Sequence, residues 1–152
     1  MCGIAAIAIG KRFRHLIPYE KLRELVSALM VELEYRGLDA SGIAVINDPN
    51  KAGSVVFKKA LRPSRMVLRE RFQEVVDGIG QDTNFVLLHA RATTSGNTSN
   101  NFNNHPILVP GCVGIHNGTL MNDDSLFHDD HRDIISEMRI LFKQQLNKEK
   151  KS

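Results

Sequence analysis

Residues 3–9 constrain the fold more than any other part of this 152-residue chain. They are small or apolar, Gly-Ile-Ala-Ala-Ile-Ala-Ile, with no alternation of polar residues. Such a run predicts a short β-strand that is buried on both faces. Cys2 comes immediately before this strand, preceded only by Met1.

Cys2 is a candidate nucleophile. Removal of Met1 would leave a thiol and an α-amino group on one residue, and methionine aminopeptidases accept a small second side chain such as this one. A cysteine thiol and an α-amine have unperturbed pKa values of about 8.5 and about 7.7–8.0, so the amine can take the thiol's proton and later pass one to a leaving group. This is the N-terminal variant of a nucleophile with its base. A cysteine that simply follows the start codon explains the same residues.

Length and composition narrow the function classes. We expect one domain over residues 1–152, with 147–152 as an exposed basic tail. The net charge of +3 lies partly in that tail, and no basic stripe is interleaved with aromatics, so we expect no nucleic-acid partner. No apolar run approaches 18 residues and the start lacks a signal-peptide layout, which predicts a cytoplasmic protein with no membrane contact.

Hydrophobic spacing predicts alternating helices and strands. Apolar residues at steps of three and four predict a helix that begins at Pro18 and ends at Gly37, in the left-handed conformation that closes helices. Further helices are expected at 64–76, from 123 and at 130–146. Strands are expected at 43–46 and 54–57, which form a hairpin, and at 85–88 and 112–115.

Three polar segments follow these elements. Residues 36–42 form a turn whose charges would pair or brace a nearby loop, although a plain helix-to-strand connection explains them equally. Residues 89–96 deliver polar groups to a sheet edge, where binding sites are commonly built. The Asn-rich loop 97–104 is long enough to cover a site. After strand 112–115, Asn117 and Gly118 offer two donors for an oxyanion, and they also suit a hairpin turn.

Four motifs now stand in one order: Met1-Cys2-Gly3-Ile4, Arg36-Gly37-x-Asp39-x-x-Gly42, His89-x-Arg91-x-x-Thr94-x-Gly96 and His116-Asn117-Gly118. This succession resembles the glutaminase domain of class II glutamine amidotransferases, which are N-terminal-nucleophile hydrolases, over residues 2–126. The resemblance implies an α+β fold, a four-layer αββα sandwich. It also implies hydrolysis of the side-chain amide of L-glutamine through a γ-glutamyl thioester, with release of ammonia and no cofactor.

The resemblance also implies a role for individual residues. Cys2 matches the nucleophile, and Asn117 with the Gly118 N–H matches the oxyanion hole. Arg91 matches the clamp on the substrate α-carboxylate, because a guanidinium binds carboxylate bidentately. Thr94 matches a hydroxyl lining the pocket. Supporting positions are Arg36, Gly37, Asp39, His89, His105 and His116.

The chain departs from the family in two ways. The family's acid that binds the substrate α-amino group commonly precedes a Ser-Glu pair, but Ile135 stands before Ser136-Glu137 and the nearest acid is Asp133. Complete family domains are also longer, so the chain resembles a short or truncated domain. It contains no segment that uses ammonia, which predicts an ammonia-accepting synthetase or transferase polypeptide as a partner.

Three other interpretations stay open on the sequence. The first is a catalytically degenerate domain that binds glutamine or a partner on the same scaffold. The second is a metal site built from His89, His105, His116 and Cys112, although their spacing lacks the paired pattern of metal ligands and favours ordinary loop histidines. The third is a redox pair of Cys2 with Cys112, which in a reducing compartment are expected to stay as thiols.

Overall fold

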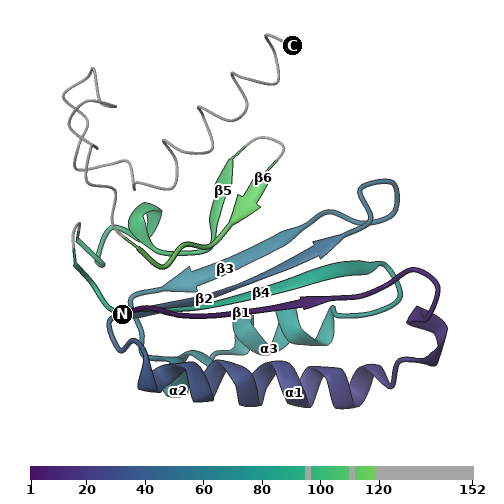
Figure 1. Cartoon of the computed structure of the whole chain (residues 1–152), viewed down its shortest axis with the longest axis horizontal. Helices are drawn as coiled ribbons and strands as arrows, with labels where there is room; N and C mark the ends of the chain where they lie inside the picture. The colour runs from purple at the N-terminus through teal and green to yellow at the C-terminus, as the bar shows by residue number, and fades with distance from the viewer. Residues whose placement is uncertain (95–96, 110–111, 119–152) are drawn as a thin grey trace, which may run out of the picture.

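The computed structural model of the chain describes residues 1–94, 97–109 and 112–118. Its centre is a four-stranded antiparallel sheet in the order β1-β4-β2-β3. Helices cover one face of this sheet, and a small antiparallel hairpin of β5 and β6 lies over the other (Figure 1). The strands are β1 (Gly3–Ala8), β2 (Ala40–Asn47), β3 (Val55–Lys59), β4 (Thr83–Arg91), β5 (Ile107–Val109) and β6 (Cys112–Gly114). The helices are η1 (Arg14–Leu16), α1 (Tyr19–Glu32), η2 (Leu33–Tyr35), α2 (Pro63–Met66), α3 (Glu70–Asp77) and η3 (Asn101–Asn103).

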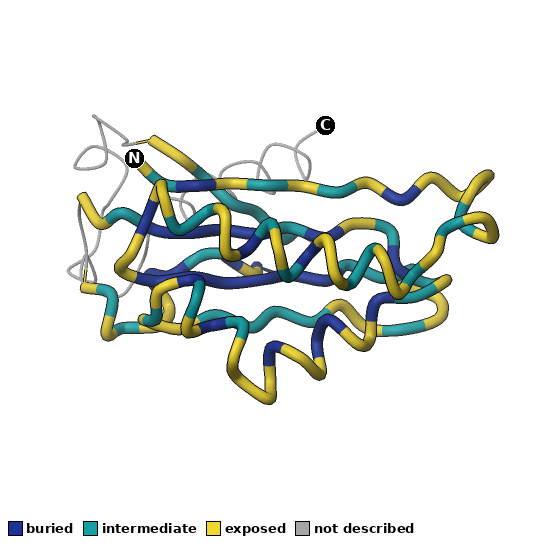
Figure 2. The backbone as a smooth tube through the Cα atoms, turned by 90° about the horizontal axis from the view of Figure 1, so that it is seen from below, coloured by how far each residue is buried: buried dark blue, intermediate teal, exposed yellow. Residues whose placement is uncertain are grey.

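The core lies between the sheet and the helical layer. Alternate residues of the central strands β2 and β4 point toward the helices, because successive side chains of a strand face opposite sides. Figure 2 shows the resulting buried stretches along the middle of the molecule. Fully buried core side chains include Val26 and Met30 of α1, Ile43 of β2, Phe72 of α3, and Val86 and Leu88 of β4. Mixed helices and antiparallel strands are compatible with the expected α+β class.

The burial of the first strand, β1, differs from the prediction. β1 was predicted to be buried on both faces, but its residues alternate, and Ile4 keeps 49% of its surface exposed. The reason is its position: β1 is an edge strand that pairs only with β4 in the sheet order, and its inward residues Ala5 and Ile7 alone pack against the core. The apolar residues on its other face lie open among the described residues.

Two helix predictions are wrong in detail. The helix expected at 64–76 is two helices, because Arg69 adopts an extended conformation with φ −84° and ψ 132°. This break leaves Leu68 72% exposed while Met66 and Phe72 both reach the core. The helix expected to run to Gly37 ends at Glu32 and continues as η2.

The strand predictions were too short at the end of the sheet that carries Cys2. The structure confirms the hairpin of β2 and β3. β4, however, continues through His89 to Arg91, so these polar residues lie within the strand and not after it. β5 was missed, because Ile107 was assigned to the end of the Asn-rich loop. The helices expected from 123 and at 130–146, together with Asp133 and the tail, lie outside the described residues.

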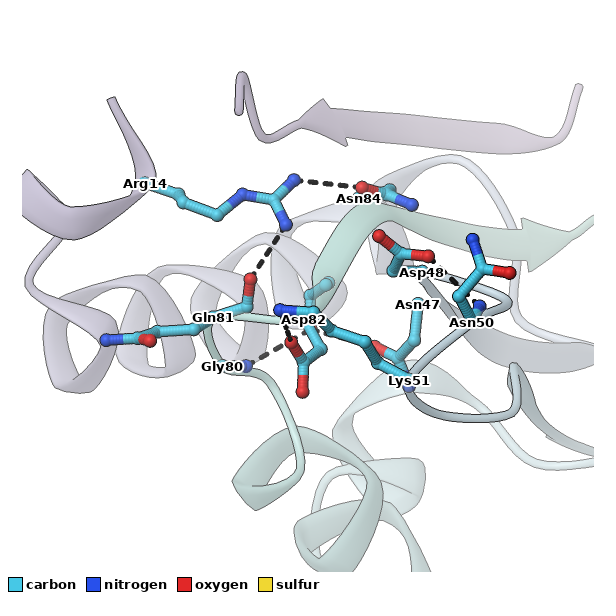
Figure 3. A network of polar contacts seen from close by, with 10 residues as sticks. Arg14, Asn47, Asp48, Asn50, Lys51, Gly80, Gln81, Asp82 and Asn84 are labelled. Atoms are coloured by element: carbon cyan, nitrogen blue, oxygen red, sulfur yellow. Dashed lines mark hydrogen bonds and ion pairs between the residues drawn. The ribbon is translucent and has the colours of Figure 1, made fainter. Parts of the chain in front are cut away.

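Figure 3 shows a polar network around the start of β4, at the end of the sheet away from the N-terminus. The Arg14 guanidinium donates to the Gln81 carbonyl at 2.8 Å and to Asn84 Oδ1 at 2.9 Å, which fixes η1 beside the start of β4. Lys51 pairs with Asp82 at 3.1 Å across the neighbouring turn. This end of the sheet is therefore braced by side chains, and the opposite end carries the predicted site. Among the described residues, no helix is long and apolar enough to cross a membrane.

Candidate active site

Cys2 and Asn117 are joined by two reciprocal hydrogen bonds. The Cys2 backbone nitrogen donates to Asn117 Oδ1 at 3.2 Å, and Asn117 Nδ2 donates to the Cys2 carbonyl at 3.0 Å. With Met1 present, this nitrogen is a peptide amide. It becomes the α-amine when Met1 is removed, and the exposed fraction of Met1, 81%, leaves that residue open to an aminopeptidase. The sequence-predicted nucleophile and oxyanion residue thus lie in contact.

The Cys2 thiol lies against the end of β4. Its Sγ is 3.5 Å from the carbonyl oxygen of Ala92, to which it donates. β1 reaches this position because Gly3 pairs with Ala90 and packs closely on the η2 turn. A Cβ on Gly3 would lie 2.9 Å from the Cβ of Arg36, so only glycine fits between strand and turn. Arg36 therefore supports the cysteine by packing, and its own side chain is exposed.

Gly37 and Asp39 hold the backbone that follows β4. A Cβ on Gly37 would lie 2.5 Å from the carbonyl carbon of Arg91, and Gly37 does not adopt the left-handed conformation that was predicted for it. The Asp39 N–H donates to the Arg91 carbonyl at 3.0 Å, and Asp39 Oδ2 accepts from the Thr93 N–H at 2.7 Å. The predicted turn is thus a brace that fixes the segment against which the Cys2 thiol lies. Thr94 follows it and is exposed.

Arg91 is buried, with 8% of its surface exposed, and its Nη1 donates to Asn104 Oδ1 at 3.0 Å. Asn104 is fully buried and connects the Asn-rich loop internally, because its Nδ2 donates to the Thr98 carbonyl at 2.8 Å and to Asn101 Oδ1 at 3.1 Å. The Asn104 carbonyl accepts from Lys58 Nζ. A guanidinium fixed in this way is preorganised, which suits a carboxylate clamp.

Sequence reasoning did not select Asn104 or Lys58 as site residues. Asn104 is one of several asparagines in an unpatterned loop, and only its burial separates it from its neighbours. Its position directly before His105-Pro106, beside a motif already recognised, was the one available signal. Lys58 belongs to a strand whose pattern gives no indication that its ammonium group turns toward the loop.

Two predicted histidines, His89 and His105, contact each other through their rings, and His89 also contacts the backbone carbonyl of His116. His89 Nε2 lies 3.1 Å from the carbonyl oxygen of His116 and 3.0 Å from His105 Nδ1. The His89 and His105 rings are edge to face, with centroids 4.4 Å apart. Burial lowers the pKa of His89 to about 4, with Arg91 and other nearby cations adding to the effect. Burial, followed by His89 itself, lowers the pKa of His105 to about 2. Both rings are therefore neutral at pH 7.

Gly118 lies on the ring of His116. A Cβ on Gly118 would be 2.8 Å from His116 Nε2, so the ring occupies the space that a side chain would need. The carbonyl of His116 is hydrogen-bonded to His89, which holds His116 in place. The ring of His116 therefore limits where Gly118 can lie.

The metal and redox interpretations gain no support from this geometry. No group of three or more His, Cys, Asp or Glu side chains within residues 1–94, 97–109 and 112–118 is placed to hold a metal ion. His116 meets His89 through its carbonyl oxygen and not through its ring. Cys2 and Cys112 form no disulfide.

The sequence is similar to part of a known enzyme. It is 32% identical over 128 residues to glutamine–fructose-6-phosphate aminotransferase (isomerizing) of Staphylococcus aureus strain Mu50, and 31% identical over 128 residues to that of Staphylococcus epidermidis strain ATCC 35984. The chain is homologous to a segment of these aminotransferases. The match covers 83% of this chain and 18% of each relative, so the chain spans about a fifth of their length. No protein-family model and no solved structure matches it.

Proposed function

We propose that this chain is the glutaminase domain of a class II glutamine amidotransferase, with Cys2 as its N-terminal nucleophile. Its homology to glutamine–fructose-6-phosphate aminotransferases supports an amidotransferase at the family level. The single observation that carries the specific chemistry is the pair of hydrogen bonds between Cys2 and Asn117, two residues 115 positions apart. That pair brings the Cys2 nitrogen, which would become the α-amine, against the Asn117 side-chain amide, and the thiol on the same residue supports its role as nucleophile.

The first half-reaction uses groups of Cys2 alone. After Met1 is removed, the α-amine accepts the thiol proton, and the sulfur attacks the Cδ of glutamine to give a tetrahedral adduct. The resulting ammonium group returns its proton to the leaving nitrogen as the C–N bond breaks, which releases ammonia and leaves a γ-glutamyl thioester. Asn117 Oδ1 already accepts from the Cys2 nitrogen at 3.2 Å, and this contact would orient the amine.

Asn117 has a second N–H for the developing oxyanion. Its side-chain amide carries two hydrogens, and one of them donates to the Cys2 carbonyl. The other, with the backbone N–H of Gly118, would stabilise the negative oxygen of the adduct, and one such donor contributes roughly 2.7–4 kcal/mol to the transition state. Water then attacks the thioester with the amine as base, and glutamate leaves as the sulfur recovers its proton.

The substrate's far end is assigned to Arg91, with Thr94 lining the pocket. The Arg91 guanidinium would bind the α-carboxylate bidentately, held in place by Asn104. Asp133 is proposed for the α-amino group. Residues 1–152 would form one domain, a four-layer αββα sandwich. The apolar outer face of the sheet, where Ile4 and Phe85 are 49% and 47% exposed, suits an inner surface of such a sandwich.

The ammonia acceptor is proposed to lie outside this chain. The curated relatives are named for transfer of nitrogen from glutamine to fructose 6-phosphate, and the chain matches only 18% of their length. We therefore propose that a synthetase or transferase polypeptide receives the ammonia, and that the reaction takes place in the cytoplasm without a cofactor.

Intact mass spectrometry with an electrophilic glutamine analogue, a chloroketone, tests the nucleophile directly. We expect the mass of Met1 to be absent and one label to be bound at Cys2. Cys2→Ala should abolish both labelling and glutamate release from glutamine, whereas Cys112→Ser should retain both. Processed protein that releases no glutamate and binds no label would contradict the glutaminase assignment.

A non-catalytic interaction domain is the alternative, and one observation favours it. A groove of about 450 Å³ lies away from Cys2, lined by apolar and basic residues. Two of its apolar side chains, Phe102 and Leu108, are 58% and 50% exposed and would be covered by a partner. Turnover that is unaffected by Cys2→Ala, or absent in the processed protein, would favour this alternative. The lining residues are Val56, Phe57, Lys58, Lys59, Asn101, Phe102 and Leu108.

A further inference from the structure

His89 is a fully buried polar residue that is connected to the proposed site through the carbonyl of His116. It belongs to β4, between Ile4 of β1 and Gly42 of β2 in the sheet register. Its Nε2 is its polar contact with the rest of the protein, at 3.1 Å from the His116 carbonyl and 3.0 Å from His105 Nδ1. Its Nδ1 is buried without a hydrogen-bond partner among the described residues.

These contacts fix which nitrogen of His89 carries the hydrogen. A carbonyl oxygen only accepts, so His89 Nε2 must donate to His116. His105 Nδ1 then faces this N–H as an acceptor. In the neutral ring with its hydrogen on Nε2, Nδ1 carries no hydrogen. The buried atom without a hydrogen-bond partner is therefore an acceptor and not a donor. The opposite tautomer could accept from His105 Nδ1, but it would bury an unpartnered N–H and direct a lone pair at the His116 carbonyl, which costs more.

The carbonyl that accepts from His89 belongs to His116, the residue immediately before Asn117. Segment 115–118 follows β6, whose pairing is limited to three residues of β5. Two described anchors tie this segment to the large sheet: the His89–His116 bond and the Asn117–Cys2 pair. The second anchor involves the reacting residue itself, whose nitrogen must exchange protons during turnover. The first anchor is therefore the fixed one.

Because His116 is held in this way, it restrains both proposed oxyanion donors, Asn117 and Gly118. Its carbonyl carbon is bonded to the nitrogen of Asn117, so a fixed carbonyl fixes the plane of that peptide. Its ring lies against Gly118, where a Cβ would come within 2.8 Å of Nε2. One hydrogen bond from β4 thus constrains Asn117, which is bonded to Cys2, and Gly118, which follows it.

We propose that His89 is a positioning residue of the glutaminase reaction, whose Nε2–H holds the His116 carbonyl and thereby aims Asn117 and Gly118 at the oxyanion. This inference rests on the proposed function. It assigns no substrate contact to His89. His105 contributes by accepting from the same N–H and so selecting the tautomer that donates.

The test compares two replacements of His89 that differ in one donor. His89→Gln keeps an N–H at the position of the imidazole Nε2, because the glutamine amide nitrogen reaches about as far along the side chain. His89→Leu removes it. His15→Leu, at an exposed histidine of η1 near the opposite end of the sheet, is the control. Glutamate release gives kcat and KM for each, and hydrogen exchange of the backbone amides of 112–118 reports the anchor itself.

We expect His89→Leu to lower kcat by about 10- to 100-fold with KM changed less than about threefold, since misplaced donors affect the transition state more than substrate binding. His89→Gln should recover most of this loss, and exchange at 112–118 should accelerate in the Leu variant alone. An active parent with equal kcat in all three variants, or equal losses in the Gln and Leu variants, would overturn the inference and leave the glutaminase assignment intact. A parent that releases no glutamate refutes the glutaminase assignment instead, and unchanged exchange at 112–118 in His89→Leu would then show that the anchor itself is absent.

Discussion

Gly37→Ala should destabilise the protein at the brace between the η2 turn and β4. The new Cβ would lie 2.5 Å from the carbonyl carbon of Arg91, 2.6 Å from its oxygen and 2.7 Å from the oxygen of Ala90, whereas ordinary contacts begin at 3.4 Å. All three neighbours are backbone atoms, so relief requires one segment to move by about 0.9 Å. Overpacking of this kind costs about 1–3 kcal/mol of unfolding free energy. For a chain of this length, that corresponds to a fall in Tm of about 2–12 °C.

Urea unfolding followed by circular dichroism measures the change, with Gly53→Ala as the matched control. No atom lies within 4 Å of a Cβ on Gly53, so that variant should keep its stability or gain up to about 1 kcal/mol through a less flexible unfolded chain. Because the displaced carbonyl belongs to Arg91, Gly37→Ala should also slow glutamate release. Equal unfolding midpoints for the two variants would refute the reasoning that Gly37 is required by close approach.

Stability should depend on pH through the buried histidines. The pKa of His89 is lowered to about 4 and that of His105 to about 2, so below about pH 6.5 the unfolded chain binds protons that the folded one does not. The free energy of unfolding should be highest above pH 6.5 and fall by up to about 1.4 kcal/mol per pH unit for each histidine as the pH drops toward 4. Urea midpoints measured from pH 7.5 to 4.5 check this, and a smaller slope is expected for His89→Gln. Asn104→Ala should lower the free energy of unfolding by at least about 1.5–3 kcal/mol, because it removes the oxygen that accepts from the charged Arg91 guanidinium. It also removes the hydrogen bonds that the Asn104 side chain makes within the loop, so limited proteolysis within 97–104 should accelerate. Asp39→Ala should cost about 0.5–1.5 kcal/mol, because it removes the carboxylate that accepts from the exposed Thr93 N–H, and a Tm equal to that of the parent would contradict this.

The sequence predicted elements better than it predicted their limits. Spacing located α1 and the β2–β3 hairpin because both have a strong period and turn residues at their ends. It failed at β4, where an apolar strand continues through His89 and Arg91. Polar side chains normally mark the end of a strand, but these two are buried because other groups in the fold bond to them. β1 was misjudged for a related reason, since alanines and isoleucines do not reveal which strand lies at an edge.

The candidate site was predictable as a set of motifs but not as a structure. The ordered motifs predicted that Cys2 and Asn117 belong to one site, and in the structure the two residues are hydrogen-bonded. Nothing in the pattern indicated that Gly37 serves close approach and not a left-handed turn, or that Asn104 connects the loop to Arg91. Such roles depend on which distant backbone comes near, and that information exists only in the assembled sheet. The catalytic and substrate roles stay predictions until they are measured.

The contact between Cys2 and Asn117 has a consequence for how the protein matures. Its two halves are separated by 115 positions, so the cysteine emerges first from the ribosome and waits for nearly all of the described chain before it meets its amide. A nascent or cleaved fragment that stops short of residue 117 would display the thiol of Cys2 without the side-chain amide that contacts Cys2 in the folded chain. The contact between Cys2 and Asn117 can therefore form only after the β5–β6 hairpin and the residues that follow it have been synthesised.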